Sequence, residues 1–172
     1  MPAVIWFHGK DSEPWGHKSL RLAELARSRG LAMEAPDHTD TKDPEERAAR
    51  ALVLVRGMDE PPILVGSSLG GYLSACVARQ LPCRGLFLLA PAVFVARVEE
   101  SVFKRQDFSG ISAPCRVVHG WRDELIPADN VIRFARPISA RLTLVDDGHR
   151  LHDSMPLIER LFELFLDEML AG

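Results

Sequence analysis

Six short apolar runs alternate along the chain with stretches in which apolar residues recur every three to four positions. The runs are continuous rather than alternating, and they predict strands buried on both faces over residues 3–7, 31–35, 63–65, 85–89, 115–119 and 141–145. The periodic stretches predict a first helix that closes at Gly30 and later helices over 44–56, 70–80, 128–135 and 155–170. This order favours a three-layer α/β/α sandwich around a mostly parallel sheet of about six strands.

Local signals add detail to this pattern. Asp43 precedes Pro44, which predicts an N-cap followed by proline at the first helical position. Residues 91–112 form the longest irregular connection, and a short helix is expected within it over 95–104. The closing helix is amphipathic, with an expected apolar face of Leu157, Ile158, Leu161, Phe162, Leu164, Phe165 and Leu166.

The length of 172 residues predicts one α/β domain over residues 1–172, with no separate lid domain. The formal net charge is −3 and no basic run is present, so nothing favours nucleic acid or an anionic membrane as a partner. The first residues read as a strand rather than a signal peptide, and no apolar run is long enough to span a bilayer. Three cysteines without metal-type spacing favour reduced thiols in a cytoplasmic protein.

The strand predicted over 63–65 leads into Gly66-Ser67-Ser68-Leu69-Gly70, which has the form G-x-S-x-G directly before a predicted helix. In that setting Ser68 occupies the tip of a strained strand–helix turn, with its hydroxyl exposed. A glycine on each side lets the strand and the helix approach closely. The motif therefore predicts Ser68 as a nucleophile. On the motif alone, a glycine-rich turn with an ordinary serine remains the alternative.

A serine nucleophile needs a base to take its proton and a third group to orient that base. Asp123 and His149 follow Ser68 in the chain, and each lies on a loop between a predicted strand and a predicted helix. Loops that follow parallel strands meet at one edge of a sheet. We therefore expect Ser68, Asp123 and His149 to form the catalytic set.

Neighbouring residues compete for two of these roles. Asp146 and Asp147 are closer to His149 in sequence, but an acid on the same loop cannot easily reach the far ring nitrogen. His152 also follows the last strand, and we expect it to belong to the entry of the closing helix. The pair His149 and His152 lacks a third ligand, so neither a metal nor another cofactor is expected.

Acyl transfer also needs backbone N–H donors that bind the negatively charged oxygen of the intermediate. The N–H of Leu69, at the start of the helix, is the first candidate. The second is the N–H of Lys10, on the loop His8-Gly9-Lys10 after the first strand, although a plain glycine turn is the alternative. Trp15 and Trp121 are expected on loops at the same edge, where they either wall an acyl pocket or pack.

These pieces together resemble the α/β-hydrolase superfamily, and within it the small, lidless bacterial serine esterases of the YqiA type. The matching motifs are His8-Gly9, the elbow Gly66–Tyr72, the loop Gly120–Asp123 and Gly148-His149. The resemblance spans the chain and implies a minimal α/β-hydrolase fold. Lys10 departs from it, because a small or apolar residue is more usual at that position.

The expected activity is hydrolysis of carboxylic esters of short to medium acyl chain through an acyl-enzyme, with a small-molecule ester as substrate. Thioesters and small amides are the nearest alternatives, because the same machinery serves each acyl bond. A protein that binds a ligand on this fold without turnover is a further alternative. The sequence leaves the oligomeric state open.

Overall fold

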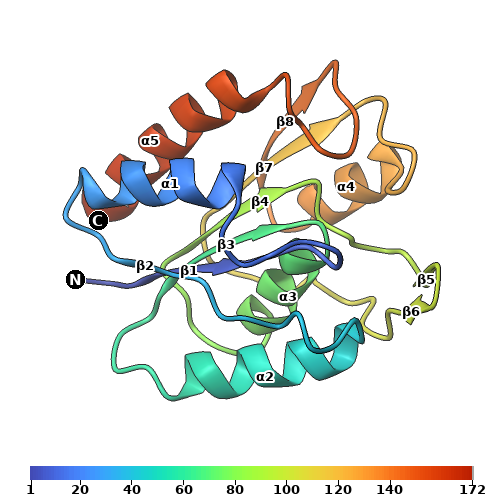
Figure 1. Cartoon of the computed structure of the whole chain (residues 1–172), viewed down its shortest axis with the longest axis horizontal. Coiled ribbons are helices and arrows are strands. Elements are labelled where there is room, and N and C mark those ends of the chain that lie inside the picture. Colours follow the sequence, from blue (N-terminus) through green and yellow to red (C-terminus); the bar gives the residue numbers. More distant parts are fainter. Residues whose placement is uncertain (172) are drawn as a thin grey trace.

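The computed structural model describes residues 1–171. Its elements are β1 (Val4–Phe7), α1 (His17–Arg27), β2 (Met33–Glu34), α2 (Pro44–Arg56), β3 (Ile63–Ser67), α3 (Leu69–Ala78), β4 (Gly85–Leu89), β5 (Arg97–Val98), β6 (Ser101–Val102), β7 (Cys115–Gly120), α4 (Ala128–Ala135), β8 (Arg141–Val145) and α5 (Met155–Ala171). One sheet of the described chain has the order β2-β1-β3-β4-β7-β8, and all its neighbouring strands are parallel (Figure 1). The predicted α/β architecture is confirmed.

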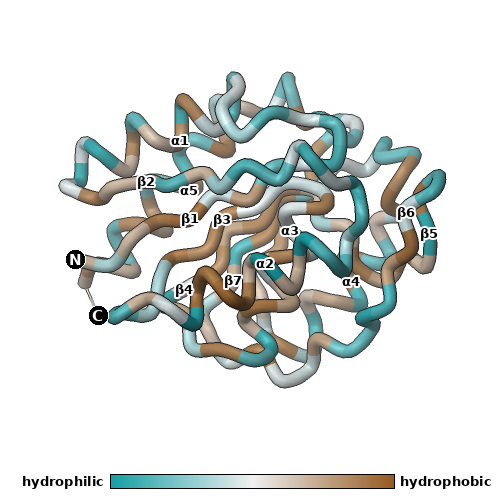
Figure 2. Tube along the Cα trace, turned by 60° about the horizontal axis from the view of Figure 1, so that its bottom comes forward, coloured by the Kyte–Doolittle hydropathy of each residue, from teal (hydrophilic) through white to brown (hydrophobic). Residues whose placement is uncertain are grey.

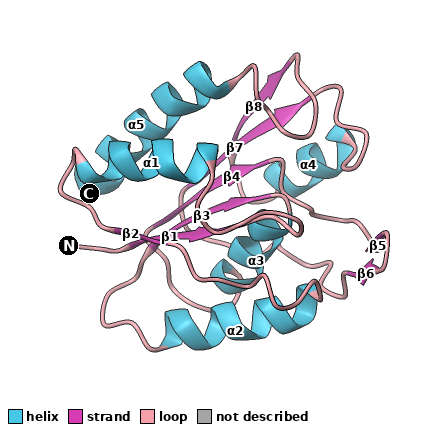
Figure 3. Cartoon of the chain, viewed as in Figure 1, coloured by secondary structure: helices cyan, strands magenta, loops and turns pink. Residues whose placement is uncertain are grey.

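Helices cover both faces of this sheet (Figure 3). Ile5 and Phe7 of β1 pack in the core beneath α2, α3 and α4, whereas Val4 and Trp6 pack in the core beneath α1 and α5. Successive side chains of a strand point to opposite faces, so each buried strand contributes to both cores. Figure 2 shows the hydrophobic strands running through the middle of the molecule. The carboxyl ends of β1, β3, β7 and β8 lie at one edge, where the loops gather that carry the candidate residues.

Helix α2 begins as its sequence predicts. The Asp43 carboxylate accepts hydrogen bonds from the backbone N–H groups of Glu45 and Glu46, and Pro44 occupies the first helical position. These acceptors satisfy amides that have no partner within the helix. The side chains of α2 that are buried against the sheet and α3 recur at helical spacing: Pro44, Arg47, Ala48, Ala51, Leu52 and Val55.

Helix α5 buries a narrower face than the sequence predicts. Ile158, Phe162 and Phe165 lie in the core, where the rings of Phe162 and Phe165 contact Phe87 of β4. Leu157 and Leu164 do not belong to this face, because their exposed fractions are 42% and 56%. Within residues 1–171, no helix combines the length and the apolar character that crossing a membrane requires.

The connection from β4 to β7 contains an antiparallel hairpin, β5 and β6, instead of the helix expected over 95–104. Tertiary contacts favour the extended form. The Ser101 hydroxyl donates to the Lys42 carbonyl at 3.0 Å, and the Phe103 ring packs edge-on against Tyr72 of α3. The Tyr72 hydroxyl in turn accepts the Arg105 N–H at 3.0 Å. The prediction of a helix was wrong because these long-range contacts outweigh local spacing.

Candidate active site

Ser68 lies at a sharp turn between β3 and α3. Its backbone has φ 56° and ψ −115°, a conformation that is rare outside glycine and costs strain energy. The turn can form because two glycines bring backbone into direct contact. A Cβ added to Gly66 would lie 2.2 Å from the Gly70 carbonyl oxygen, and one added to Gly70 would lie 1.7 Å from the Phe7 carbonyl oxygen. The turn therefore packs against both its own strand and the end of β1.

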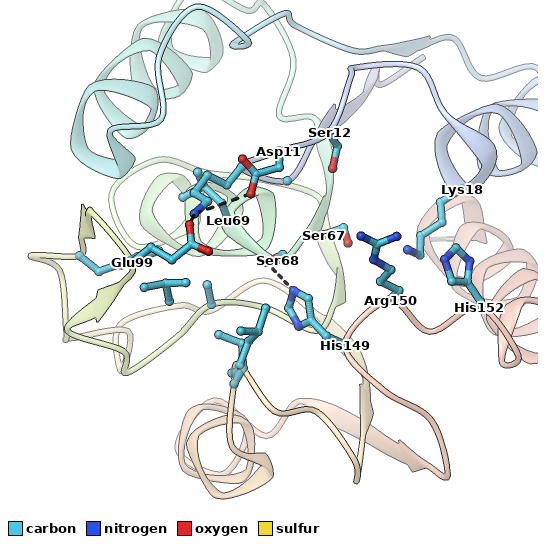
Figure 4. Close-up of a pocket in the computed structure, with 17 residues that line it drawn as sticks. Asp11, Ser12, Lys18, Ser67, Ser68, Leu69, Glu99, His149, Arg150 and His152 are labelled. Atoms are coloured by element: carbon cyan, nitrogen blue, oxygen red, sulfur yellow. Dashed lines mark hydrogen bonds and ion pairs between the residues drawn. The ribbon is translucent and has the colours of Figure 1, made fainter.

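The turn brings Ser68 next to His149, and His149 next to Asp123. The distance from Ser68 Oγ to His149 Nε2 is 2.9 Å, and that from His149 Nδ1 to Asp123 Oδ2 is 2.7 Å (Figure 4). An ionised carboxylate only accepts hydrogen bonds, so Nδ1 must carry the proton. In the neutral ring Nε2 is then free to accept a hydrogen bond from the Ser68 hydroxyl. The three residues come from the loops after β3, β7 and β8.

Asp123 is fixed before it meets the imidazole. Its side chain is fully buried, and its Oδ1 accepts the N–H groups of Leu125 and Ile126, both at 2.9 Å. Burial by itself raises the pKa of the Asp123 carboxyl, but the hydrogen bonds from His149 and these two amides outweigh it and hold the pKa below its usual value. One oxygen therefore orients the carboxylate, and the other is left for His149.

The residues that compete in the sequence for the roles of acid and base lie elsewhere in the structure. Asp146 is exposed and pairs with Arg122 at 2.7 Å. Asp147 holds the loop that carries His149. Its carboxylate accepts hydrogen bonds from the N–H of Gly148 and from both the N–H and the hydroxyl of Ser154. His152 is exposed, and among the described residues it has no hydrogen bond to Ser68.

The two amides expected to bind an oxyanion lie beside Ser68. Lys10 and Leu69 both line the cavity that contains Ser68, and in residues 1–171 neither backbone N–H has a hydrogen-bond acceptor. The Lys10 ammonium group contacts the carboxylates of Glu99 and Asp11. The unusual lysine thus ties its loop to the β5–β6 hairpin, while its amide remains unpaired.

Two buried side chains hold the His8–Lys10 loop, and sequence reasoning had not singled out either for this role. The guanidinium of Arg47, a fully buried residue of α2, donates to the carbonyls of Thr41, Gly9 and Lys10 at 2.7, 3.1 and 3.2 Å. The Gly9 carbonyl also accepts His8 Nδ1 at 2.8 Å. His8 Nε2 accepts the His38 N–H, which is consistent with a proton on Nδ1. Burial lowers the pKa of His8, which favours the neutral imidazole.

The cavity around Ser68 has a volume of about 390 Å³. Apolar side chains line one part of it, from Leu69, Ala92, Val98, Phe103, Leu125 and Ile126. Trp15 and Trp121 do not line it and are exposed by 44% and 58%, so neither walls this pocket nor packs in the core. Within the described residues, no three His, Cys, Asp or Glu side chains gather closely enough to hold a metal ion.

Comparison with known proteins places this chain in a family. Residues 3–109, more than half of the chain, match the model of an uncharacterised protein family, UPF0227. The chain belongs to the UPF0227 family. A crystal structure from Xanthomonas campestris, assigned to the alpha/beta hydrolase superfamily, is 37% identical to this UPF0227 protein, with a TM-score of 0.85. That match covers 98% of this chain and 99% of the other.

More distant structures share the fold of this UPF0227 protein. Est1E from Butyrivibrio proteoclasticus is 18% identical with a TM-score of 0.83, over 99% of this chain and 89% of its own. The ydeN product of Bacillus subtilis is 17% identical with a TM-score of 0.78, over the full length of both chains. No curated protein matches the sequence. The predicted membership of the α/β-hydrolase superfamily is confirmed. The UPF0227 match includes Ser68 and ends before Asp123 and His149.

Proposed function

We propose that this protein is a serine hydrolase that cleaves carboxylic esters through an acyl-enzyme. The observation that carries the proposal is the chain of hydrogen bonds from Ser68 through His149 to Asp123, at a turn where Ser68 has a positive φ. An ordinary turn serine needs neither this strained backbone nor a buried acid behind its histidine. The three groups have the geometry that an activated nucleophile requires.

In the proposed reaction, His149 Nε2 takes the proton of Ser68 as Oγ attacks the carbonyl carbon of the ester. The negatively charged carbonyl oxygen is bound by the free N–H groups of Lys10 and Leu69. When the intermediate collapses, the bond to the alcohol oxygen breaks and His149 gives that oxygen the proton. Water, with His149 again acting as base, then releases the acid and restores Ser68. Asp123 keeps the imidazole in the correct tautomer.

The proposed substrates have short to medium acyl chains. In this proposal the protein acts as one domain without a lid domain. The β4–β7 connection forms only a small hairpin, and its Phe103 packs against Tyr72 of α3. A cavity of about 390 Å³ accepts a small ester. Faster turnover of an emulsified long-chain triglyceride than of a soluble short ester would contradict this substrate range.

A fluorophosphonate probe tests the proposal directly. It should label wild-type protein on Ser68, and the protein should hydrolyse para-nitrophenyl butyrate. A parallel panel with the matching thioester and anilide ranks the three acyl bonds. A protein that folds but neither reacts with the probe nor hydrolyses any member of the panel would instead be a ligand-binding protein on this fold.

His149 and His152 should separate cleanly as variants. His149→Ala is expected to lower kcat on para-nitrophenyl butyrate by roughly 10³-fold or more, because it removes the base that lies 2.9 Å from Ser68 Oγ. His152→Ala, an exposed change three positions away, should retain most of the rate. Circular dichroism checks that both variants fold. The opposite pattern of rates would move the base to His152.

Arg47 is expected to act on the rate through the peptide between Gly9 and Lys10. This peptide is planar and trans, so holding the Gly9 carbonyl towards Arg47 and His8 turns the Lys10 N–H the opposite way. Arg47→Lys keeps the charge but loses the planar fork that reaches three carbonyls. We expect kcat to fall about tenfold while KM changes little. The reason is that a misplaced Lys10 N–H loses its hydrogen bond to the oxyanion, which is made in the transition state.

Two measurements separate this positioning role from a general loss of stability. Added guanidinium chloride, at a low concentration that does not unfold the protein, should restore part of the rate of Arg47→Ala. The matched control is Arg50→Lys, one turn further along α2, where the guanidinium pairs with Asp40 and Glu46 at the surface. If both lysine variants lose the same fraction of kcat, Arg47 has no special connection with the site.

A further inference from the structure

One wall of the cavity carries two cationic side chains without a partner. Lys18, in the first turn of α1, and Arg150, directly after His149, both line the cavity with Ser68. Across residues 1–171, no carboxylate lies within 4.0 Å of the charged group of either. Figure 4 draws the two side by side, on the side of Ser67 and Ser68 away from Glu99. This wall therefore holds two positive charges, neither of which forms an ion pair with a carboxylate of the described residues.

The other charged residues of the cavity are neutralised. Lys10 contacts both Glu99 and Asp11, and Asp11 also binds Lys42 at 2.7 Å. On that side of the cavity, each positive charge is therefore paired with a carboxylate. Lys18 and Arg150 differ in this respect from Lys10, because they line the same cavity but form no ion pair.

Keeping Lys18 beside Arg150 has an electrostatic cost. Burial lowers the pKa of the Lys18 ammonium, and the positive charge of Arg150 lowers it further. The carboxylate of Asp147 acts in the opposite direction, but its oxygens already accept the hydrogen bonds of Gly148 and Ser154. A ligand anion between Lys18 and Arg150 would remove this repulsion and would form charge-assisted hydrogen bonds with both.

The first turn of α1 adds to the same preference. It contains no acidic residue, and Gly16 offers no side chain to cap it. The partial positive charge of a helix N-terminus favours an anion. The opposite part of the cavity combines the neutralised pair of Lys10 and Glu99 with apolar lining residues such as Leu69, which Figure 4 draws beside Glu99. The cavity thus has one end suited to an anionic group and another suited to a hydrocarbon group, with Ser68 between them.

We propose that Lys18 and Arg150 form a subsite for an anionic group, a carboxylate or a phosphate, on the ester that Ser68 attacks. This inference rests on the proposed function and narrows its substrate class to esters with an apolar end and an anionic end. It also predicts that binding weakens as salt concentration rises, because salt screens partly exposed charges.

Kinetics with matched esters test the subsite. The anion is placed on the acyl side in para-nitrophenyl hydrogen succinate, on the alcohol side in para-acetoxybenzoate, and as phosphate in para-acetoxyphenyl phosphate. Para-nitrophenyl butyrate and phenyl acetate are the neutral references. We expect Lys18→Met and Arg150→Gln each to lower the ratio of anionic to neutral kcat/KM about tenfold for at least one of the three, mainly through KM. The anionic ester that responds identifies the side and the group.

Arg56→Gln is the matched control, because it removes the same charge at the last turn of α2, away from the cavity, and should leave the ratio unchanged. A binding measurement makes the result independent of turnover. Calorimetry on Ser68→Ala should give a Kd for para-nitrophenyl hydrogen succinate, para-acetoxybenzoate or para-acetoxyphenyl phosphate that weakens at least tenfold when Lys18→Met and Arg150→Gln are added.

The two measurements distinguish the two proposals. Hydrolysis of neutral esters with unchanged ratios and unchanged Kd values in the Lys18 and Arg150 variants would overturn the anion subsite and leave the esterase proposal standing. No hydrolysis of any ester, together with a Kd that depends on Lys18 and Arg150, would overturn the esterase proposal and support an anion site in a binding protein.

Discussion

Ser68→Ala is expected to lower kcat on para-nitrophenyl butyrate by roughly 10³-fold or more, because it removes the atom that forms the acyl-enzyme. The remaining rate would come from the backbone amides of Lys10 and Leu69 and from binding alone. The fluorophosphonate probe should no longer label the protein. The substitution removes a single oxygen atom and adds nothing to the cavity. KM for the neutral ester should therefore change far less than kcat.

Ser67→Ala is the control for this result. Ser67 lies in β3, one residue earlier, and lines the same cavity without a hydrogen bond to His149 among the described residues. Most of the activity should remain in this variant. Probe labelling of Ser67 instead of Ser68, found by mass spectrometry of the peptide, would refute the assignment of the nucleophile.

Asp123→Asn should reduce kcat by about 10³- to 10⁴-fold with little change in fold. The reason lies in the two amides that point at Oδ1. Because Leu125 and Ile126 donate there, the asparagine oxygen must take that position, and its NH₂ group must face His149 Nδ1. Nδ1 then becomes the acceptor and Nε2 carries the proton. In that tautomer the imidazole cannot accept the proton of Ser68.

Nitrogen NMR of labelled histidine measures this tautomer separately from the rate, and the expected change is a transfer of the proton from Nδ1 to Nε2. Asp146→Asn is the matched control, since this aspartate precedes His149 by three residues but is exposed and bound to Arg122. A mild effect of Asp123→Asn beside a severe effect of Asp146→Asn would reassign the acid.

Much of the fold follows from local patterns in the sequence. The strands over 85–89 and 141–145 have the predicted bounds, although 141–145 contains Arg141 and Thr143 and is only partly buried. Asp43 with Pro44 marks the start of α2. The same logic explains why Ser68, Asp123 and His149 meet. Each follows a strand of one parallel sheet, so their loops share an edge whatever their separation in the chain.

The failures have physical causes of another kind. The apolar stripe of α5 is wider than the surface that packs against this helix. Leu157 and Leu164, at its margin, therefore stay exposed. Residues 97–102 form a hairpin because Ser101 bonds to Lys42 and the adjoining Phe103 packs on Tyr72 of α3, contacts that no local window contains. Arg47 looks like a surface arginine, yet it shares a stripe with Ala51 and Val55 at intervals of four, and that spacing was a signal of its burial.

The contact between Gly70 and the Phe7 carbonyl has a consequence for how the site responds to a ligand. The residue after Phe7 begins the loop that carries Lys10, so the Ser68 turn packs closely against the strand end from which this loop starts. Neither can move without displacing a central strand. In the proposed hydrolase, attacking atom and oxyanion donor would therefore keep a fixed spacing before substrate arrives. Free and inhibited forms should superimpose here, leaving adjustment to the side chains of the cavity wall.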